Sequence, residues 1–145
     1  MIRALAYISP RRLRRLGYTE IPLVFEVIAG YGLYRRLQSR ELPELIARMG
    51  HASAKPKTDP ARLVRAADWF LHPLYGSGRC VPRSLILFRL LRRRGHNPTV
   101  VYGLKPEKRD GIAGHAWVLL DGKPFAEWDD PTLKYIETYR YPAQT

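Results

Sequence analysis

The hydrophobic positions of the chain change their pattern about two thirds of the way along it. Up to residue 95, apolar residues recur at helical spacing and are interrupted by prolines, glycines and polar loops. After Pro98, β-branched and aromatic residues gather in short runs, which are typical of strands. The order predicts helices followed by an antiparallel sheet, which is an α+β fold with the helices grouped against one sheet.

Start and stop signals delimit the predicted helices. Thr19 and Asp59 are expected to cap helices that begin with a proline in the first turn, and Pro73 and Gly95 are expected to end helices. The predicted helices cover residues 10–16, 20–38, 43–50, 60–72 and 83–94. The last one is apolar around most of its girth, so we expect it to be buried in the core.

Three strands are predicted in the C-terminal part. They cover residues 99–104, 116–120 and 125–128. The polar segment 105–111 is the loop between the first two, and Asp121-Gly122 is a hairpin signal between the second and third. The buried helix should therefore pack on a small antiparallel meander.

Composition indicates one globular domain with a strong positive charge. The chain has 145 residues, which suits a single domain over 1–145 whose residues 1–52 form a helical N-terminal region. Lys and Arg number 25 against 13 acidic residues, a net charge of +12. The arginine clusters flank apolar helical stretches, so they form solvated helix faces or a surface for an acidic partner. No helix-turn-helix, zinc-ligand spacing or aromatic RNA motif is present, so nucleic acid is not an expected partner.

The sequence favours a cytoplasmic location. The longest apolar run, 21–34, has about 14 residues and contains Glu26, whereas a membrane span needs roughly 20. The N-terminus lacks the pattern of a signal peptide. A single cysteine rules out an intrachain disulfide and fits a reducing compartment.

Cys80 is the first candidate for chemistry, because it lies next to the N-terminal end of the buried helix, with Pro82 in the first turn. Unpaired backbone donors and the helix dipole favour the thiolate there, and the Cys80 amide could hold an oxyanion. The alternative is a small buried hydrophobe without a catalytic role.

His115 is the candidate base, because it begins the second predicted strand beside Gly114 and could reach a neighbouring helix end. His51, His72 and His96 lie beside loops or glycines and are interpreted as surface residues. One cysteine and scattered histidines offer no metal-ligand spacing, so we expect no metal and no cofactor.

The third member of a cysteine–histidine site would be an acid that orients the imidazole. With a three-residue turn after the second strand, Leu120 would pair with Pro124, and the returning strand would place Glu127 and Asp129 on the side of His115. A two-residue turn would reverse this parity.

These residues resemble the transglutaminase-like cysteine proteases that remove leader peptides in lasso-peptide biosynthesis. The resemblance covers roughly residues 62–141 and rests on motifs that occur in order along the chain. They are Cys80-Val81-Pro82-Arg83-Ser84, the leucine-rich helix with its Arg92-Arg93-Arg94-Gly95 ending, Tyr102-Gly103, and His115-Ala116-Trp117-Val118 with Asp121-Gly122. The length and arginine-rich start are similar to those of the stand-alone protease subunit.

The resemblance implies a papain/transglutaminase-like core with a Cys80, His115 and acid triad. The family acid usually follows the histidine by twelve residues, which is Glu127 here, where aspartate is more common; Asp129 is the alternative acid. It also implies three partners: a lasso precursor peptide, a separate leader-peptide-binding protein and a lactam-forming cyclase. Two other readings stay open, namely an acyl transferase of the same fold and a non-catalytic basic module that binds an acidic peptide or nucleic acid.

Overall fold

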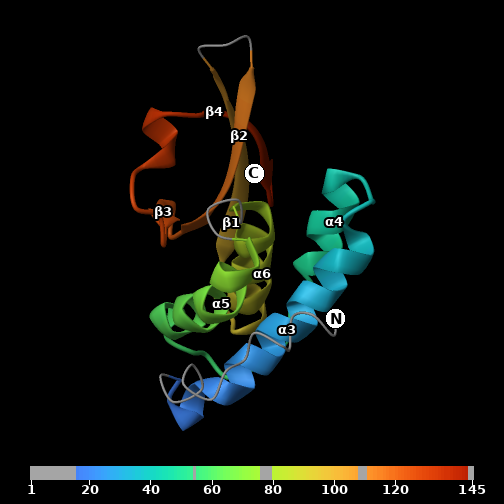
Figure 1. Cartoon of the computed structure of the whole chain (residues 1–145), viewed down its shortest axis with the longest axis vertical. Coiled ribbons are helices and arrows are strands. Elements are labelled where there is room, and N and C mark those ends of the chain that lie inside the picture. The colour runs from blue at the N-terminus through green and yellow to red at the C-terminus, as the bar shows by residue number, and fades with distance from the viewer. Residues whose placement is uncertain (1–15, 54, 76–79, 108–110, 144–145) are drawn as a thin grey trace.

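A computed structural model describes residues 16–53, 55–75, 80–107 and 111–143. Within these ranges, four α-helices precede a four-stranded antiparallel sheet, so the α+β prediction is confirmed. Helix α6 lies against the sheet, and α3, α4 and α5 surround α6 on its other sides (Figure 1). The predicted helix at 10–16 lies outside the described residues except for Leu16. No helix in the described ranges is long and apolar enough to cross a bilayer.

The first two described α-helices begin at the predicted prolines. A 3-10 turn, η1 (Tyr18–Glu20), leads into α3 (Ile21–Leu37), and α4 spans Leu42–Met49. Both helices carry proline in the first turn, where its missing N–H costs no intrahelical hydrogen bond. The cap prediction at Thr19 is wrong, because the 3-10 turn moves the N-cap of α3 to Glu20, which makes no side-chain cap bond.

Helix α5 (Pro60–Tyr75) starts as predicted and ends later than predicted. Asp59 accepts a hydrogen bond of 2.9 Å from the backbone N–H of Ala61, as a capping residue should. The break expected at Pro73 does not occur, because the helix continues to Tyr75. Tertiary contacts hold this last turn: the Tyr75 hydroxyl bonds that of Tyr31 at 3.1 Å, and the two rings meet edge to face.

Helix α6 (Cys80–Arg93) begins three residues before the predicted start. Cys80 is therefore the first residue of the helix rather than a residue ahead of it. Pro82 is buried within the first turn, where a proline is still tolerated. Gly95 ends the helix in the left-handed region, with φ of +73°.

The sheet has the strand order β3-β2-β1-β4. The strands are β1 (Pro98–Pro106), β2 (Ile112–Leu120), β3 (Lys123–Phe125) and β4 (Ile136–Tyr141). The meander of the first three was predicted, but β4, which pairs with β1 on its other edge, was not. The β1–β2 hairpin extends beyond the N-terminal end of α6 (Figure 1).

The predicted pairing of β2 with the returning strand is wrong by one residue. The turn holds only Asp121 and Gly122, both with positive φ, at 52° and 76°. This is the pattern of a type I′ turn, which matches the twist of the strands. Leu120 therefore pairs with Lys123, and the third strand stops at Phe125 instead of continuing to residue 128.

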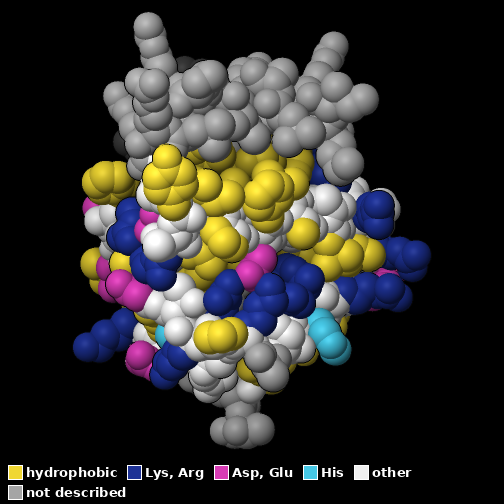
Figure 2. Space-filling view, turned by 90° about the horizontal axis from the view of Figure 1, so that it is seen from below, with side chains coloured by type: hydrophobic (Ala, Val, Ile, Leu, Met, Phe, Trp, Pro, Cys, Tyr) yellow, Lys and Arg dark blue, Asp and Glu magenta, His cyan; other side chains and the backbone are white. Residues whose placement is uncertain are grey.

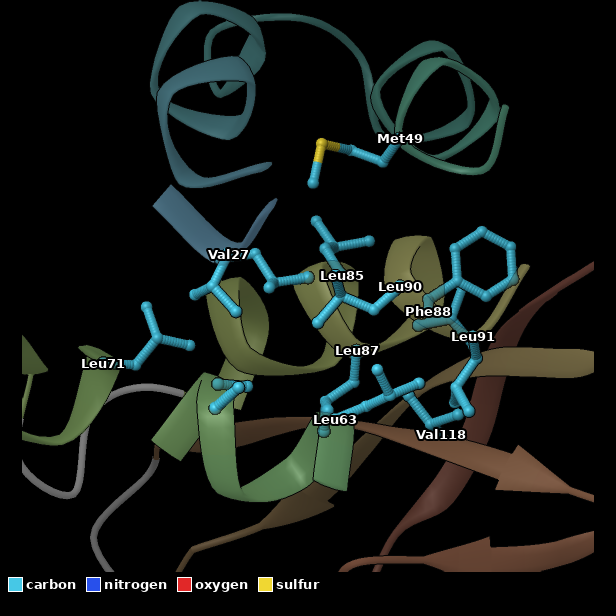
Figure 3. Close-up of a cluster of buried hydrophobic side chains, with 14 of the residues drawn as sticks. Val27, Met49, Leu63, Leu71, Leu85, Leu87, Phe88, Leu90, Leu91 and Val118 are labelled. Carbon is cyan, nitrogen blue, oxygen red and sulfur yellow. The ribbon is translucent and has the colours of Figure 1, made fainter. Parts of the chain in front are cut away.

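The main core surrounds α6. Side chains from the helices and from β2 point at one another around it (Figure 3). Fully buried members include Val27 of α3, Met49 of α4, Leu63 of α5 and Leu87 of α6, with Val118 of β2. A smaller cluster lies on Val101, Trp117 and Leu119, with Tyr135 packed against it. Because side chains alternate along β2, the Trp117 cluster occupies the sheet face opposite Val118.

Gly103 permits the close packing of this second cluster. It pairs with His115, and a Cβ at its position would lie 2.8 Å from the Trp117 ring and 2.9 Å from Cβ of Tyr135. We expect Gly103→Ala to lower the free energy of unfolding by about 1–3 kcal/mol through overpacking. Urea denaturation measures this change.

Gly32→Ala is the matched control. A Cβ at Gly32 would meet no atom of the described chain within 4 Å, and this glycine lies inside α3. Higher helix propensity should stabilise the protein by about 0.5–1 kcal/mol. If Gly103→Ala left the free energy of unfolding unchanged, the side chains of the cluster would have to accommodate the added methyl group without loss of stability.

Candidate active site

Cys80 lies where α6 meets β2. The helix is anchored there by Ser84, which is buried and donates a 2.8 Å hydrogen bond to the backbone carbonyl of Ala116. Backbone hydrogen bonds from Val81 and Ala116 reach the Cys80 sulfur. These donors come from the first turn of α6 and from β2, and both favour the thiolate.

His115 approaches Cys80 from β2. In the described part of the chain, β3 pairs only with Val118 to Leu120, so His115 lies on the stretch of β2 beyond the end of β3. Its ring stacks on Trp117 with centroids 5.9 Å apart and lies 5.1 Å from that of Tyr135. These aromatic contacts hold the imidazole in place beside the sulfur, to which it is hydrogen-bonded.

Glu127 completes a chain of three side chains. Nε2 of His115 bonds Oε2 of Glu127 at 3.0 Å, which leaves Nδ1 for the thiol. The register of β3 alone would direct Glu127 away from His115, because the two-residue turn reverses the parity. Ala126 corrects this: its positive φ of 58° interrupts the strand alternation and turns the next side chain toward the imidazole.

Asp129, the alternative acid, does not reach His115 in this structure. Its side chain is 71% exposed, and it pairs with Lys134 at 2.6 Å. The pairing of His115 with Asp129 expected from a three-residue turn is therefore wrong. Glu127, with 15% of its side chain exposed, is the acid at the site.

The three groups shift one another's protonation equilibria. The hydrogen bond to His115 is the largest cause that lowers the pKa of Cys80, and it outweighs burial, which acts in the opposite direction. Hydrogen bonds to Cys80 and then to Glu127 raise the pKa of His115 to about 9. Both directions favour a thiolate–imidazolium pair, which is the reactive form of a catalytic cysteine.

The other histidines stay apart from this site. His51 and His72 are exposed, as expected, whereas His96 is half-buried and its Nε2 bonds the carbonyl oxygen of Thr58 at 2.8 Å. Within the described ranges, no three His, Cys, Asp or Glu residues group closely enough to hold a metal ion.

The sequence analysis missed two residues that organise the site. Ser84 fixes α6 against β2, and Arg83 contacts Glu127, with Nη1 3.6 Å from Oε1. Both occur in the motif that follows Cys80. A usable signal was present, because a polar residue on an otherwise apolar, buried helix needs a specific partner.

Replacement of the acid tests its assignment. Glu127→Gln keeps the shape of the side chain but removes the charge that supports the imidazolium, so the pKa of His115 should fall from about 9. We expect the rate of thiol chemistry at Cys80 to drop about 10- to 100-fold. Activity assays and NMR titration of His115 measure the two effects.

Asp129→Asn is the matched control, because it removes the same charge from an exposed side chain two residues away. It should leave both readouts unchanged. A larger loss of activity in Asp129→Asn than in Glu127→Gln would reverse the assignment of the acid.

Comparison with known proteins gives a family. The model of the transglutaminase-like superfamily matches residues 24–140, from α3 to β4, and so includes Cys80, His115 and Glu127. Searches of curated proteins and of solved structures gave no match. The superfamily generally includes cysteine peptidases and acyltransferases. Since the match spans most of the 145 residues, the chain belongs to the transglutaminase-like superfamily.

Proposed function

We propose that this protein is a cysteine protease that removes the leader peptide from a lasso-peptide precursor before macrolactam formation. The observation that carries the proposal is the hydrogen-bonded series from Cys80 through His115 to Glu127. The motif resemblance around these residues supports the choice of a lasso precursor as substrate. Superfamily membership supports thiol chemistry in general.

The first half of the reaction forms a thioester. The Cys80 thiolate attacks the carbonyl carbon at the junction of leader and core, and the oxyanion is held by backbone N–H groups at the start of α6. The imidazolium of His115 then gives its proton to the departing core amine. The C–N bond breaks, and the leader stays on sulfur as an acyl group.

The second half consumes one water molecule. Neutral His115 takes a proton from the water, whose oxygen attacks the thioester carbonyl. The C–S bond breaks, the leader leaves as a carboxylic acid, and the proton returns the thiolate–imidazolium pair. Glu127 holds the ring in the required orientation throughout, through its bond to Nε2.

Acyl transfer to an amine is the second candidate, because it uses the same three residues and occurs in the same superfamily. The two reactions differ in the group that opens the thioester. Incubation with a lasso precursor and its leader-binding protein, followed by mass spectrometry, separates them. A free leader acid supports hydrolysis, a leader amide supports transfer, and an intact precursor contradicts both.

We propose that partners with a net negative charge dock on a surface rich in Lys and Arg side chains. On the face shown in Figure 2, Lys and Arg side chains gather with acidic side chains among them. With a net charge of +12, the protein should attract an acidic leader-binding protein or an acidic segment of the precursor. Binding should weaken as salt is raised, which fluorescence anisotropy of a labelled precursor measures.

A further inference from the structure

Arg83 joins three elements next to the site. Its side chain on α6 is only 13% exposed and lies one helical turn after Cys80. Nε and Nη2 bond the two carboxylate oxygens of Asp68 in α5, at 2.6 and 3.1 Å. The guanidinium also contacts Glu127, and the same Nη2 donates to the backbone carbonyl of Ala126 at 3.1 Å.

Two of these contacts fall on the residues that aim the acid. Ala126 has a φ of 58°, a left-handed conformation that an alanine rarely adopts, because its Cβ crowds the following carbonyl oxygen. That conformation directs Glu127 to His115, so something must hold it. Arg83 binds the carbonyl of the strained residue and Oε1 of the carboxylate, while Oε2 is left for His115.

We infer that Arg83 is a positioning residue: anchored by Asp68, it holds the strained turn at Ala126 and orients Glu127 toward His115. The inference rests on the proposed triad. It also explains why the residue is arginine. The planar guanidinium can bind the Asp68 carboxylate through two N–H groups and still donate a hydrogen bond to the carbonyl of Ala126. A lysine ammonium cannot span the same three partners.

A test must separate orientation from charge. Loss of Arg83 alone would leave Asp68 as an added negative charge near the site. The double variant Arg83→Gln with Asp68→Asn removes one charge of each sign, and the single Asp68→Asn variant is measured beside it. Among the described residues, the other groups that interact electrostatically with Cys80 are His115 from β2, Tyr34 from α3 and Tyr102 from β1, and neither variant changes them.

The measurement is the rate of Cys80 alkylation by iodoacetamide as a function of pH. Cys80 is the only cysteine, so the signal belongs to one thiol. We expect the Arg83/Asp68 double variant to move the midpoint of the profile upward by about one pH unit, because His115 loses its oriented acid. With a precursor peptide as substrate, kcat should fall about tenfold or more with little change in KM.

Arg94→Gln with Glu26→Gln is the matched control. Arg94 is equally buried, with 11% of its side chain exposed, and is ion-paired with Glu26 just beyond the opposite end of α6. This control should lose thermal stability to a similar degree without moving the alkylation profile. An equal shift in both double variants would reduce Arg83 to a structural ion pair.

A second comparison isolates the route of the effect. In a Glu127→Ala background, the Arg83/Asp68 changes should add no further shift, since the carboxylate that they orient is gone. A full additional shift in that background, or an unchanged profile in the first experiment, would overturn the inference. The alkylation assay needs no peptide substrate, so it tests the role of Arg83 separately from cleavage. If the protein cleaves no precursor but its alkylation midpoint still depends on Arg83 through Glu127, only the proposed function is contradicted.

Discussion

Cys80→Ala should abolish cleavage of a lasso precursor, with a loss of about 10⁴-fold or more. The reason is that the reaction has no other thiol: Cys80 is the only cysteine, and its sulfur forms the bond that replaces the peptide bond. Loss of the nucleophile in a comparable triad removes nearly all of the rate enhancement that the triad supplies. Quantitative mass spectrometry of leader and precursor over time measures the effect.

The same variant should still fold and bind. Cys80 is half-buried and outside the main core cluster, so the midpoint of thermal unfolding should stay within about 4 °C. Binding of a labelled precursor should be retained, which separates chemistry from recognition. Cleavage by the alanine variant at the original rate would remove Cys80 from the mechanism.

His115→Ala should reduce cleavage about 10³-fold, because one residue supplies both the general acid and the general base. It should also restore an ordinary pKa at Cys80, since the hydrogen bond to His115 is the main cause of the lowered value. In the unsubstituted protein, the ion pair exists between the lowered pKa of Cys80 and the pKa of His115 at about 9. Alkylation of the variant should therefore be slower at pH 7.

The difference in alkylation rate between His115→Ala and the unsubstituted protein should shrink as pH rises. Above the pKa of His115, at about 9, the imidazolium loses its proton and no longer stabilises the thiolate. The alkylation rates of His115→Ala and of the unsubstituted protein should then converge as pH rises. A constant ratio of the two rates from pH 6 to pH 10 would mean that His115 affects Cys80 only through the fold.

That Cys80 and His115 would meet was predictable because their signals are local. A cysteine two residues before a proline, at the start of a leucine-rich segment, marks a helix start, even though the helix begins at Cys80 instead of residue 83. The acid could not be found from pairing geometry. The direction of the Glu127 side chain depends on the positive φ of Ala126. Alanine rarely adopts that conformation, so the residue type at this position did not predict a turn. The pairing geometry offered Glu127 and Asp129 alike, and only the spacing of the family motif favoured Glu127.

Tertiary contacts account for the other differences in the fold. Pro73 is a helix breaker by local rules, but contacts between Tyr75 and Tyr31 keep the last turn of α5 helical. Strand β4 carries charged residues at the sheet edge and none of its residues is fully buried, so it lacks the buried alternation that identifies strands. In both cases the deciding partner is distant in the sequence.

The most direct test of the account is a titration of the Cys80 thiolate by its ultraviolet absorbance, taken as the difference from the Cys80→Ala protein. If Cys80 and His115 share a proton, thiolate should appear below the ordinary thiol range of about pH 8.5, and His115→Ala should move the midpoint back up. A midpoint at the ordinary value that does not respond to loss of His115 would contradict the catalytic pair and, with it, the proposed enzyme.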